Sequence, residues 1–211
     1  MIVDTMSWDE IGSYFDKLGI EFKKKYLNYI KRCLKCDRYL KQPKDIISYP
    51  LRKFDMGNND KVFLIRFIRE DRNAGVMLFS PFRYKGKQYF ARLVPGEKHT
   101  VCFSLHSMKR YYERFEKIEG KDINLDEDSV ADVLIYNDCT VAKPIKTIYK
   151  NKSYILFTCN DGAFLGYRKE SISILNTFIT KEMMHLLQSL TFQVANKILT
   201  NLTLSERAIA V

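Results

Sequence analysis

Four strand-sized apolar segments stand close together in the second half of the chain, and they limit its fold more than any other feature. They cover residues 144–150, 153–159, 163–169 and 172–179. Asn151-Lys152 and Asp161-Gly162 separate the first three, and an Asp-Gly pair strongly favours a tight hairpin turn. Parallel neighbours would need long crossover connections, so turns this short predict a four-stranded antiparallel meander.

The first half contains three more segments of this kind, at 62–69, 75–84 and 87–94. Gly75 and the Lys85-Gly86 pair mark the turns between them. A second antiparallel meander is therefore expected upstream of the first.

Helical periodicity describes most of the remaining chain. Ser7 and Glu10 form a capping-box pattern that opens a helix over 8–18, and Gly19 is expected to end it. A longer helix follows over 20–41. Its expected core stripe consists of Ile20, Leu27, Ile30 and Leu34, with Cys33 as a further candidate. Three further helices are expected at 104–117, 126–137 and 181–199.

Together these segments predict an α+β protein: N-terminal helices and a three-strand meander, then two helices, a four-stranded antiparallel meander and a C-terminal helix. A boundary near Pro95-Gly96 would separate a basic helical and β-meander region, 1–95, from an α+β domain, 96–211. One continuous domain is the alternative, because the chain length permits both arrangements.

Charge is unevenly distributed along the 211 residues. Residues 1–100 carry 21 Lys and Arg against 12 Asp and Glu, which is +9 of the total net charge of +10. Residues 101–211 carry 14 against 13. The imbalance favours RNA or another acidic partner for the first half. Basicity that only maintains solubility is the alternative.

The helix expected over 20–41 carries a row of cations at helical spacing, with tyrosines interleaved. The row consists of Lys24, Lys31, Lys35 and Arg38. Lysine and arginine bind phosphates, and aromatic rings stack on bases. These four residues, and Arg168 in the second half, are therefore candidates for nucleic-acid binding. A solvated helix flank is the alternative interpretation.

Several classes of function find no support in the sequence. The five cysteines form no disulfide framework, and the pair Cys33 and Cys36 lacks the partner ligands of a zinc site. Free buried thiols in a reducing cytoplasm are therefore expected, with no metal and no cofactor. The longest apolar runs are strand-sized and the N-terminus lacks a secretory signal pattern, so no membrane role is expected.

The helix expected over 104–117 separates two kinds of side chain. Its apolar side chains share one stripe, namely Leu105, Met108, Tyr112 and Phe115. Its polar side chains share the opposite side, namely His106, Arg110, Glu113 and Lys117, with Arg114 at the border. An imidazole one turn from a guanidinium suits a site that acts on phosphate. The alternative is a solvated helix face with an ion pair between Glu113 and Arg114.

The order of elements around this helix resembles the barnase/EndoU/colicin/RelE-like superfamily of toxin-type, metal-independent bacterial endoribonucleases. The resemblance covers about residues 100–185. It rests on the His106-x-x-x-Arg110-x-x-Glu113-Arg114 helix, the Asp161-Gly-x-x-Leu-Gly166 turn and the strand that ends in Thr177-Phe-Ile-Thr180.

This resemblance implies a cytoplasmic toxin or effector that cleaves RNA by attack of the ribose 2′-hydroxyl on the adjacent phosphate, and a protein that neutralises it. The reaction needs a general base, a general acid and a cation for the phosphorane charge. His106 would be the base or acid, and Arg110 and Arg114 would bind the phosphate. Thr177 and Tyr167 would be further catalytic candidates from the sheet.

Three hypotheses remain open at this point, and they leave open whether the chain is an enzyme. The first is the RNA-cleaving toxin. The second is a non-catalytic nucleic-acid- or partner-binding protein of phage or mobile-element origin, which the charge of the first half suggests. The third is a structural or assembly protein whose meander edges and last helix make subunit contacts.

Overall fold

The computed structural model describes residues 2–35, 47–68, 74–95, 99–114, 125–136, 145–149, 152–159, 162–169, 171–184 and 193. In chain order, the elements are α1 (Trp8–Cys33), β1 (Ile47–Ser48), β2 (Arg52–Gly57), β3 (Asp60–Ile68), β4 (Ala74–Tyr84), β5 (Lys87–Leu93), β6 (Thr100–Ser104), α2 (Leu105–Arg114), α3 (Glu127–Tyr136), β7 (Ile145–Tyr149), β8 (Lys152–Thr158), β9 (Gly162–Lys169), β10 (Ile172–Thr180) and the 3-10 helix η1 (Lys181–Met183). The predicted α+β class is confirmed.

Within these residues, ten strands form one sheet in the order β1-β3-β4-β5-β6-β10-β9-β8-β7, and β2 also pairs with β3. β3, β4 and β5 form the first predicted antiparallel meander, and β6 continues it. β7 to β10 form the second. β6 and β10 are parallel neighbours, with Phe103 opposite Leu175. Strands from both expected regions, 1–95 and 96–211, therefore belong to one sheet.

β1, β2 and β6 are strands that the sequence pattern does not predict. All five residues of β6 are buried, so this strand lacks the alternation of apolar and polar residues that marks a half-exposed strand. Phe103 and Ser104 belong to β6, and the following helix begins at Leu105. Ser104 caps this helix, since the Ser107 N–H donates to the Ser104 hydroxyl at 3.1 Å.

α1 is one helix, and the prediction of two helices separated at Gly19 is wrong. Gly19 lies inside α1, on the side of the helix that packs on the sheet. A Cβ at Gly19 would lie 3.7 Å from the Cβ of Leu93, and one at Gly12 would lie 2.6 Å from the Oγ of Ser171. Gly12 therefore permits a close approach of the helix to Ser171, whereas a Cβ at Gly19 would make only ordinary contacts. Neither glycine ends the helix.

The buried face of α1 also differs from the predicted stripe. Ile20 and Leu27 are 47% and 38% exposed. The residues that pack on the sheet are instead Ile11, Phe15, Leu18 and Phe22, and Ile30 joins them as predicted. Tyr26 departs from helical geometry, with φ −115° and ψ 22°, so the helix bends between its two halves. The last part of the helix expected over 20–41, residues 36–41, lies outside the described residues.

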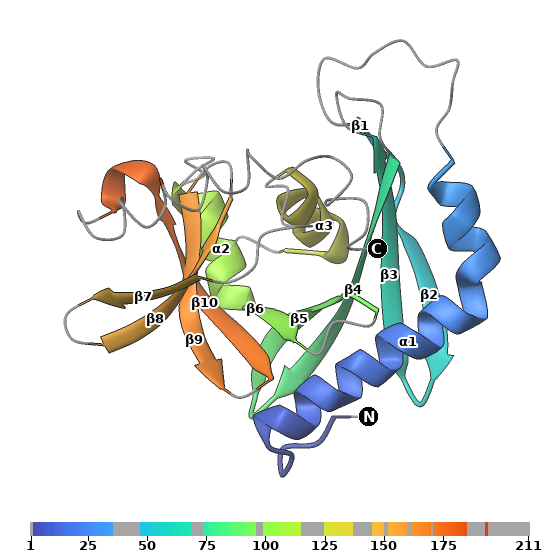
Figure 1. Ribbon diagram of the computed structural model, residues 1–211, viewed down its shortest axis with the longest axis horizontal. Helices are drawn as coiled ribbons and strands as arrows, with labels where there is room; N and C mark the ends of the chain where they lie inside the picture. Colours follow the sequence, from blue (N-terminus) through green and yellow to red (C-terminus); the bar gives the residue numbers. More distant parts are fainter. Residues whose placement is uncertain are drawn as a thin grey trace.

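Helices cover both faces of the sheet, as Figure 1 shows. α1 crosses the face called here the outer face, whereas α2 and α3 lie on the inner face, where the sheet bends around them. Alternate residues of β3 serve the two layers: Val62 and Leu64 pack with α1, and Phe63 and Ile65 pack with α2 and α3.

The inner core contains the residues that hold α2 and α3. Met108 is buried as predicted, and Tyr111, which the predicted stripe omits, is only 2% exposed. Leu105 and Tyr112 are partly buried against this core, and residues 115–117 lie outside the described residues. α3 contributes Val130, Ala131, Val133 and Leu134.

The chain after β10 differs from the helix predicted over 181–199. Lys181–Met183 is a 3-10 helix, and Met184 is extended. Residues 185–192 and 194–199 lie outside the described residues. Among the described helices, none is both long and apolar enough to cross a membrane.

Gly166 allows a test of the β9–β10 pairing. It lies inside β9 and not in a turn, and an added Cβ would clash with the carbonyl oxygen of Ile174. Gly166→Ala is therefore expected to lower the free energy of unfolding by roughly 3 kcal/mol, as in an overpacked core. Urea denaturation followed by circular dichroism measures this change.

Gly19→Ala is the matched control, because its Cβ would make ordinary contacts and alanine favours a helix. A similar loss of stability in both variants would contradict the pairing described here.

Candidate functional site

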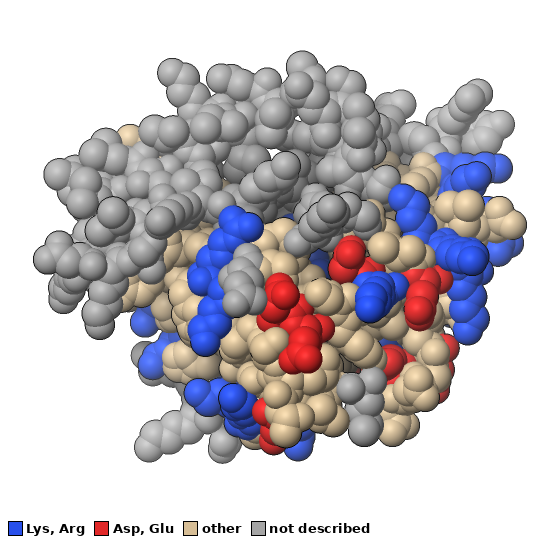
Figure 2. All heavy atoms as spheres, turned by 60° about the horizontal axis from the view of Figure 1, so that its bottom comes forward, with Lys and Arg blue, Asp and Glu red and all other residues tan. Residues whose placement is uncertain are grey.

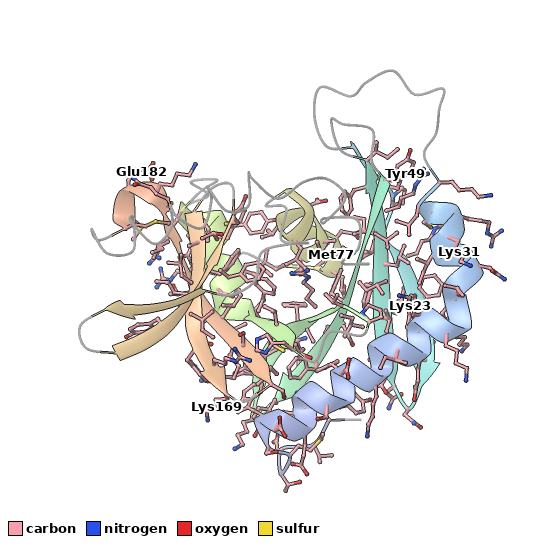
Figure 3. All side chains as sticks on the ribbon, in the orientation of Figure 1. Lys23, Lys31, Tyr49, Met77, Lys169 and Glu182 are labelled. Atoms are coloured by element: carbon pink, nitrogen blue, oxygen red, sulfur yellow. The ribbon has the colours of Figure 1, made fainter. Side chains whose placement is uncertain are left out.

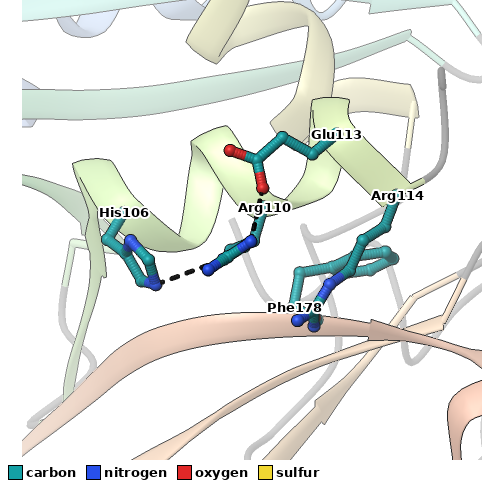
Figure 4. Close-up of polar contacts among 5 residues, drawn as sticks. All are labelled: His106, Arg110, Glu113, Arg114 and Phe178. Atoms are coloured by element: carbon teal, nitrogen blue, oxygen red, sulfur yellow. Dashed lines mark hydrogen bonds and ion pairs between the residues drawn. The ribbon is translucent and has the colours of Figure 1, made fainter. Parts of the chain in front are cut away.

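His106, Arg110 and Glu113 form a polar cluster on the exposed side of α2, shown in Figure 4. The buried residues Met108 and Tyr111 fix the helix on the inner core. Arg110 Nη1 lies 2.7 Å from Glu113 Oε2, and Arg110 Nε donates to His106 Nε2 at 3.5 Å. The structure thus brings together the imidazole and guanidinium that the sequence predicts as a pair.

Arg110 lies between an imidazole and a carboxylate, which determines what this cluster can do. Arg110 Nε donates to His106 Nε2, so this contact occupies the ring nitrogen that faces the guanidinium. A phosphate bound by Arg110 would release Nε2 to act as a proton acceptor. The Arg110 and Glu113 side chains are 41% and 35% exposed, so their ion pair contributes only about 0.2 to 0.5 kcal/mol to stability.

Arg114 has a different environment from Arg110. Its guanidinium donates a hydrogen bond to the carbonyl oxygen of Phe178 on β10. Burial and the charge of Arg110 lower the pKa of Arg114, and Glu113 partly opposes this change. Arg114 therefore ties α2 to the sheet, whereas Arg110 projects from it.

Tyr167 and Thr177, the other catalytic candidates, lie on the outer face of the sheet. Tyr167 pairs with Ile174 and packs with the core beneath α1. Thr177 precedes Phe178, whose ring is in the inner core, so the alternation of β10 places Thr177 on the outer side. The sheet separates both residues from His106, and the five catalytic candidates do not converge on one site.

A pocket of about 460 Å³ lies between α1, the β2–β3 turn and the β4–β5 hairpin. Tyr14 and Asp60 both line it, and the Tyr14 hydroxyl donates a hydrogen bond to the Asp60 carboxylate. Burial and this carboxylate raise the pKa of Tyr14. None of the catalytic or nucleic-acid-binding candidates lines the pocket.

The C-terminal half of α1 and the adjacent strand β2 form a surface called here the basic face. It consists of exposed cations, namely Lys24, Lys25, Lys31, Arg32, Lys35 and Arg52. The chain contains no Asp or Glu between Phe22 and Lys35. Figure 2 shows Lys and Arg side chains along the right-hand edge of the molecule, and Figure 3 shows Lys31 on the outer side of α1. Arg38 lies outside the described residues.

Two tyrosines of the basic face have a cation near the ring. Lys25 Nζ is 5.3 Å from the ring centre of Tyr26, and the guanidinium carbon of Arg32 is 5.8 Å from that of Tyr29. Both rings also pack against Phe54 of β2, with ring centres 4.7 and 5.5 Å apart. These tyrosines therefore help to hold α1 against β2.

The environment of Tyr29 shows that cations from two elements share this surface. Burial raises the pKa of Tyr29, and Cys33 adds to the increase. Arg52 of β2 and Arg32 of α1 oppose it, because each favours the phenolate. Arg52, which the sequence row does not include, thus belongs with the cations of α1.

Arg168 lies apart from the basic face, on β9 opposite Ser173. His99 Nε2 is 2.6 Å from the Ser173 hydroxyl oxygen. Burial and the charge of Arg168 lower the pKa of His99. The sequence does not indicate this contact, because His99 stands outside any periodic pattern and its partner is distant along the chain.

No family model, curated protein or solved structure matches this chain. The resemblance to toxin-type ribonucleases therefore stays a prediction. In the part of the chain that the structure describes, no group of three or more His, Cys, Asp or Glu residues could hold a metal ion. Cys33, Cys102 and Cys159 are buried and form no disulfide in the described structure, and Cys36 and Cys139 lie outside the described residues.

The environment of His99 predicts that stability depends on pH. Its pKa in the folded protein is below the ordinary value of 6.5, so the unfolded chain takes up a proton first as the pH falls. His99 is therefore expected to leave the free energy of unfolding unchanged above about pH 6.5 and to lower it progressively below that pH.

Thermal denaturation of the wild type and of His99→Gln at pH 7.5 and pH 5.5 measures this effect. The decrease in Tm on acidification should be smaller in the variant, which does not titrate in this range. Equal decreases in the two proteins would show that His99 does not contribute.

Proposed function

We propose that the protein binds nucleic acid through the basic face. The supporting observation is a set of exposed cations on α1 and β2. The part of α1 that contributes to this set contains no acidic residue after Phe22. Cations that neutralise successive phosphates release condensed counterions, and this release drives binding to a polyanion. The first hundred residues also carry +9 of the net charge of +10.

The position of the cations favours ligand binding over a purely structural role. The helix dipole attracts cations to the last turn of a helix, which accounts for Lys31 and Arg32. Its effect decreases within one turn, so it does not account for Lys24 and Lys25 in the middle of α1. A surface that only maintains solubility would mix both charges, as the first half of α1 does.

Charge reversal tests this proposal. Lys24→Glu combined with Lys31→Glu is expected to weaken nucleic-acid binding by roughly tenfold or more, and to reduce the slope of log affinity against log salt by about 2, one unit for each lost phosphate contact. Fluorescence anisotropy with labelled RNA and DNA, at several salt concentrations, measures both quantities.

Lys17→Glu combined with Lys87→Glu is the matched control, because it changes the net charge equally and Lys17 lies on the same helix. Equal weakening in the two double variants would mean that only net charge matters. Failure of the wild type to bind RNA or DNA at low salt would exclude the proposal.

A second candidate function is metal-independent RNA cleavage at the His106–Arg110 pair, as in a toxin or effector. It is favoured by the contact of the two side chains at 3.5 Å on an exposed surface that a phosphate can reach. Arg110 would bind the phosphate, and His106 would act as base or acid for attack by the 2′-hydroxyl. A neutralising protein would then cover this side of α2.

Incubation of RNA with purified protein in the presence of a chelator tests this candidate. The expected products carry 2′,3′-cyclic phosphate ends, since the 2′-hydroxyl is the nucleophile. His106→Ala and Arg110→Ala are each expected to reduce the rate by roughly 100-fold, whereas Lys109→Ala on the same helix should keep it. Intact RNA with the wild type, or cleavage that both variants retain, would remove this candidate.

A further inference from the structure

Tyr49 and Arg66 form a stacked pair beside the basic face. The guanidinium carbon of Arg66 lies 4.5 Å from the ring centre of Tyr49. The Tyr49 N–H also donates to the carbonyl oxygen of Arg66 at 2.9 Å, so the tyrosine is held against β3 by its backbone as well. Figure 3 shows Tyr49 near the end of α1.

Arg66 connects this pair to α1. Its Nη2 donates a hydrogen bond to the carbonyl oxygen of Lys35, at 3.2 Å, directly after the C-terminal end of the helix. The side chain of Lys35 belongs to the basic face, so the ring of Tyr49 and the cations of α1 are parts of one continuous surface.

Tyr49 differs from the other tyrosines of this region in its surroundings. Tyr26 and Tyr29 pack into the outer core against Phe54. Tyr49 belongs to none of the hydrophobic clusters that the described residues form, and it is partly exposed. The described structure therefore holds this ring through a cation and a backbone bond, and not through core packing.

From this geometry we infer that the ligand of the basic face is single-stranded nucleic acid, with one base stacked on Tyr49 and its phosphates on Lys31 and Lys35. This inference rests on the proposed nucleic-acid binding and specifies its substrate class. A ring held in place loses little freedom when a base stacks on it. In a duplex the bases are already stacked and paired, so the ring would gain no such contact.

The test compares single-stranded and duplex oligonucleotides of equal length and related sequence, as both RNA and DNA, by fluorescence anisotropy. The wild type should bind the single strand roughly tenfold or more tightly than the duplex, which is what one base stack contributes. Tyr49→Leu should remove this preference, and Tyr49→Phe, which keeps the ring, should retain it. Lys31→Glu should weaken binding to both forms.

Each outcome decides between the two proposals. Duplex binding as tight as single-strand binding, or unchanged affinity in Tyr49→Leu, would overturn the single-strand inference and leave the basic face as a general nucleic-acid surface. Competition by polyglutamate as effective as that by the oligonucleotide would overturn it in favour of an acidic protein. Absence of any binding would exclude both proposals. The preference of the wild type for single strands over duplex is measured without any variant. It therefore tests the inference even if Tyr49→Leu does not fold.

Discussion

The parallel pairing of β6 with β10 is the interaction on which the rest of this structure depends. It is the contact that joins the two antiparallel meanders into one sheet. Phe103 in β6 packs edge-on against Phe157 and Phe164, from β8 and β9, with ring centres 5.7 and 5.1 Å apart. α2 starts immediately after β6, so this pairing also determines where His106 and Arg110 stand relative to the sheet.

This same pairing explains which parts of the fold the sequence could predict. The meander of β7 to β10 follows from local turns and strand-length apolar runs, and it was predicted correctly. β6 was not, because its burial depends on neighbours from β5 and β10 that lie far away in the chain. A strand with polar and apolar residues buried alike, such as Thr100 and Phe103, carries no periodic pattern of its own.

The glycines of α1 illustrate a related limit of prediction from the sequence. A glycine near a polar segment usually marks the end of a helix, and Gly19 was interpreted in that way. In the structure it lies inside the helix and faces Leu93 of the sheet. Which of the two roles a glycine has depends on what lies opposite, and one sequence does not contain that information. The exposed positions of Ile20 and Leu27 follow from the same shift in the buried face.

The candidate sites likewise separate into features that follow from local sequence and features that depend on long-range contacts. The His106–Arg110 pair and the row of Lys24, Lys31 and Lys35 follow from spacing within one helix, and the structure shows both. Arg52 belongs to the basic face, and Tyr49 lies beside it, only because β2 and β1 pair with β3. Tyr167 and Thr177 were assigned to the His106 site from their order in the chain, which does not distinguish the two faces of a sheet.

The position of the sheet between these two sites bears on which function they serve. The basic face belongs to the layer of α1 on the outer face, whereas His106 and Arg110 lie on α2 over the inner face. A nucleic-acid strand bound along α1 would therefore not reach His106 directly, because the sheet lies between them. Binding at the basic face does not require the α2 cluster, and cleavage at that cluster would need its own contacts to RNA. The two proposed activities are thus physically separable, and the larger set of exposed cations makes binding the better supported proposal.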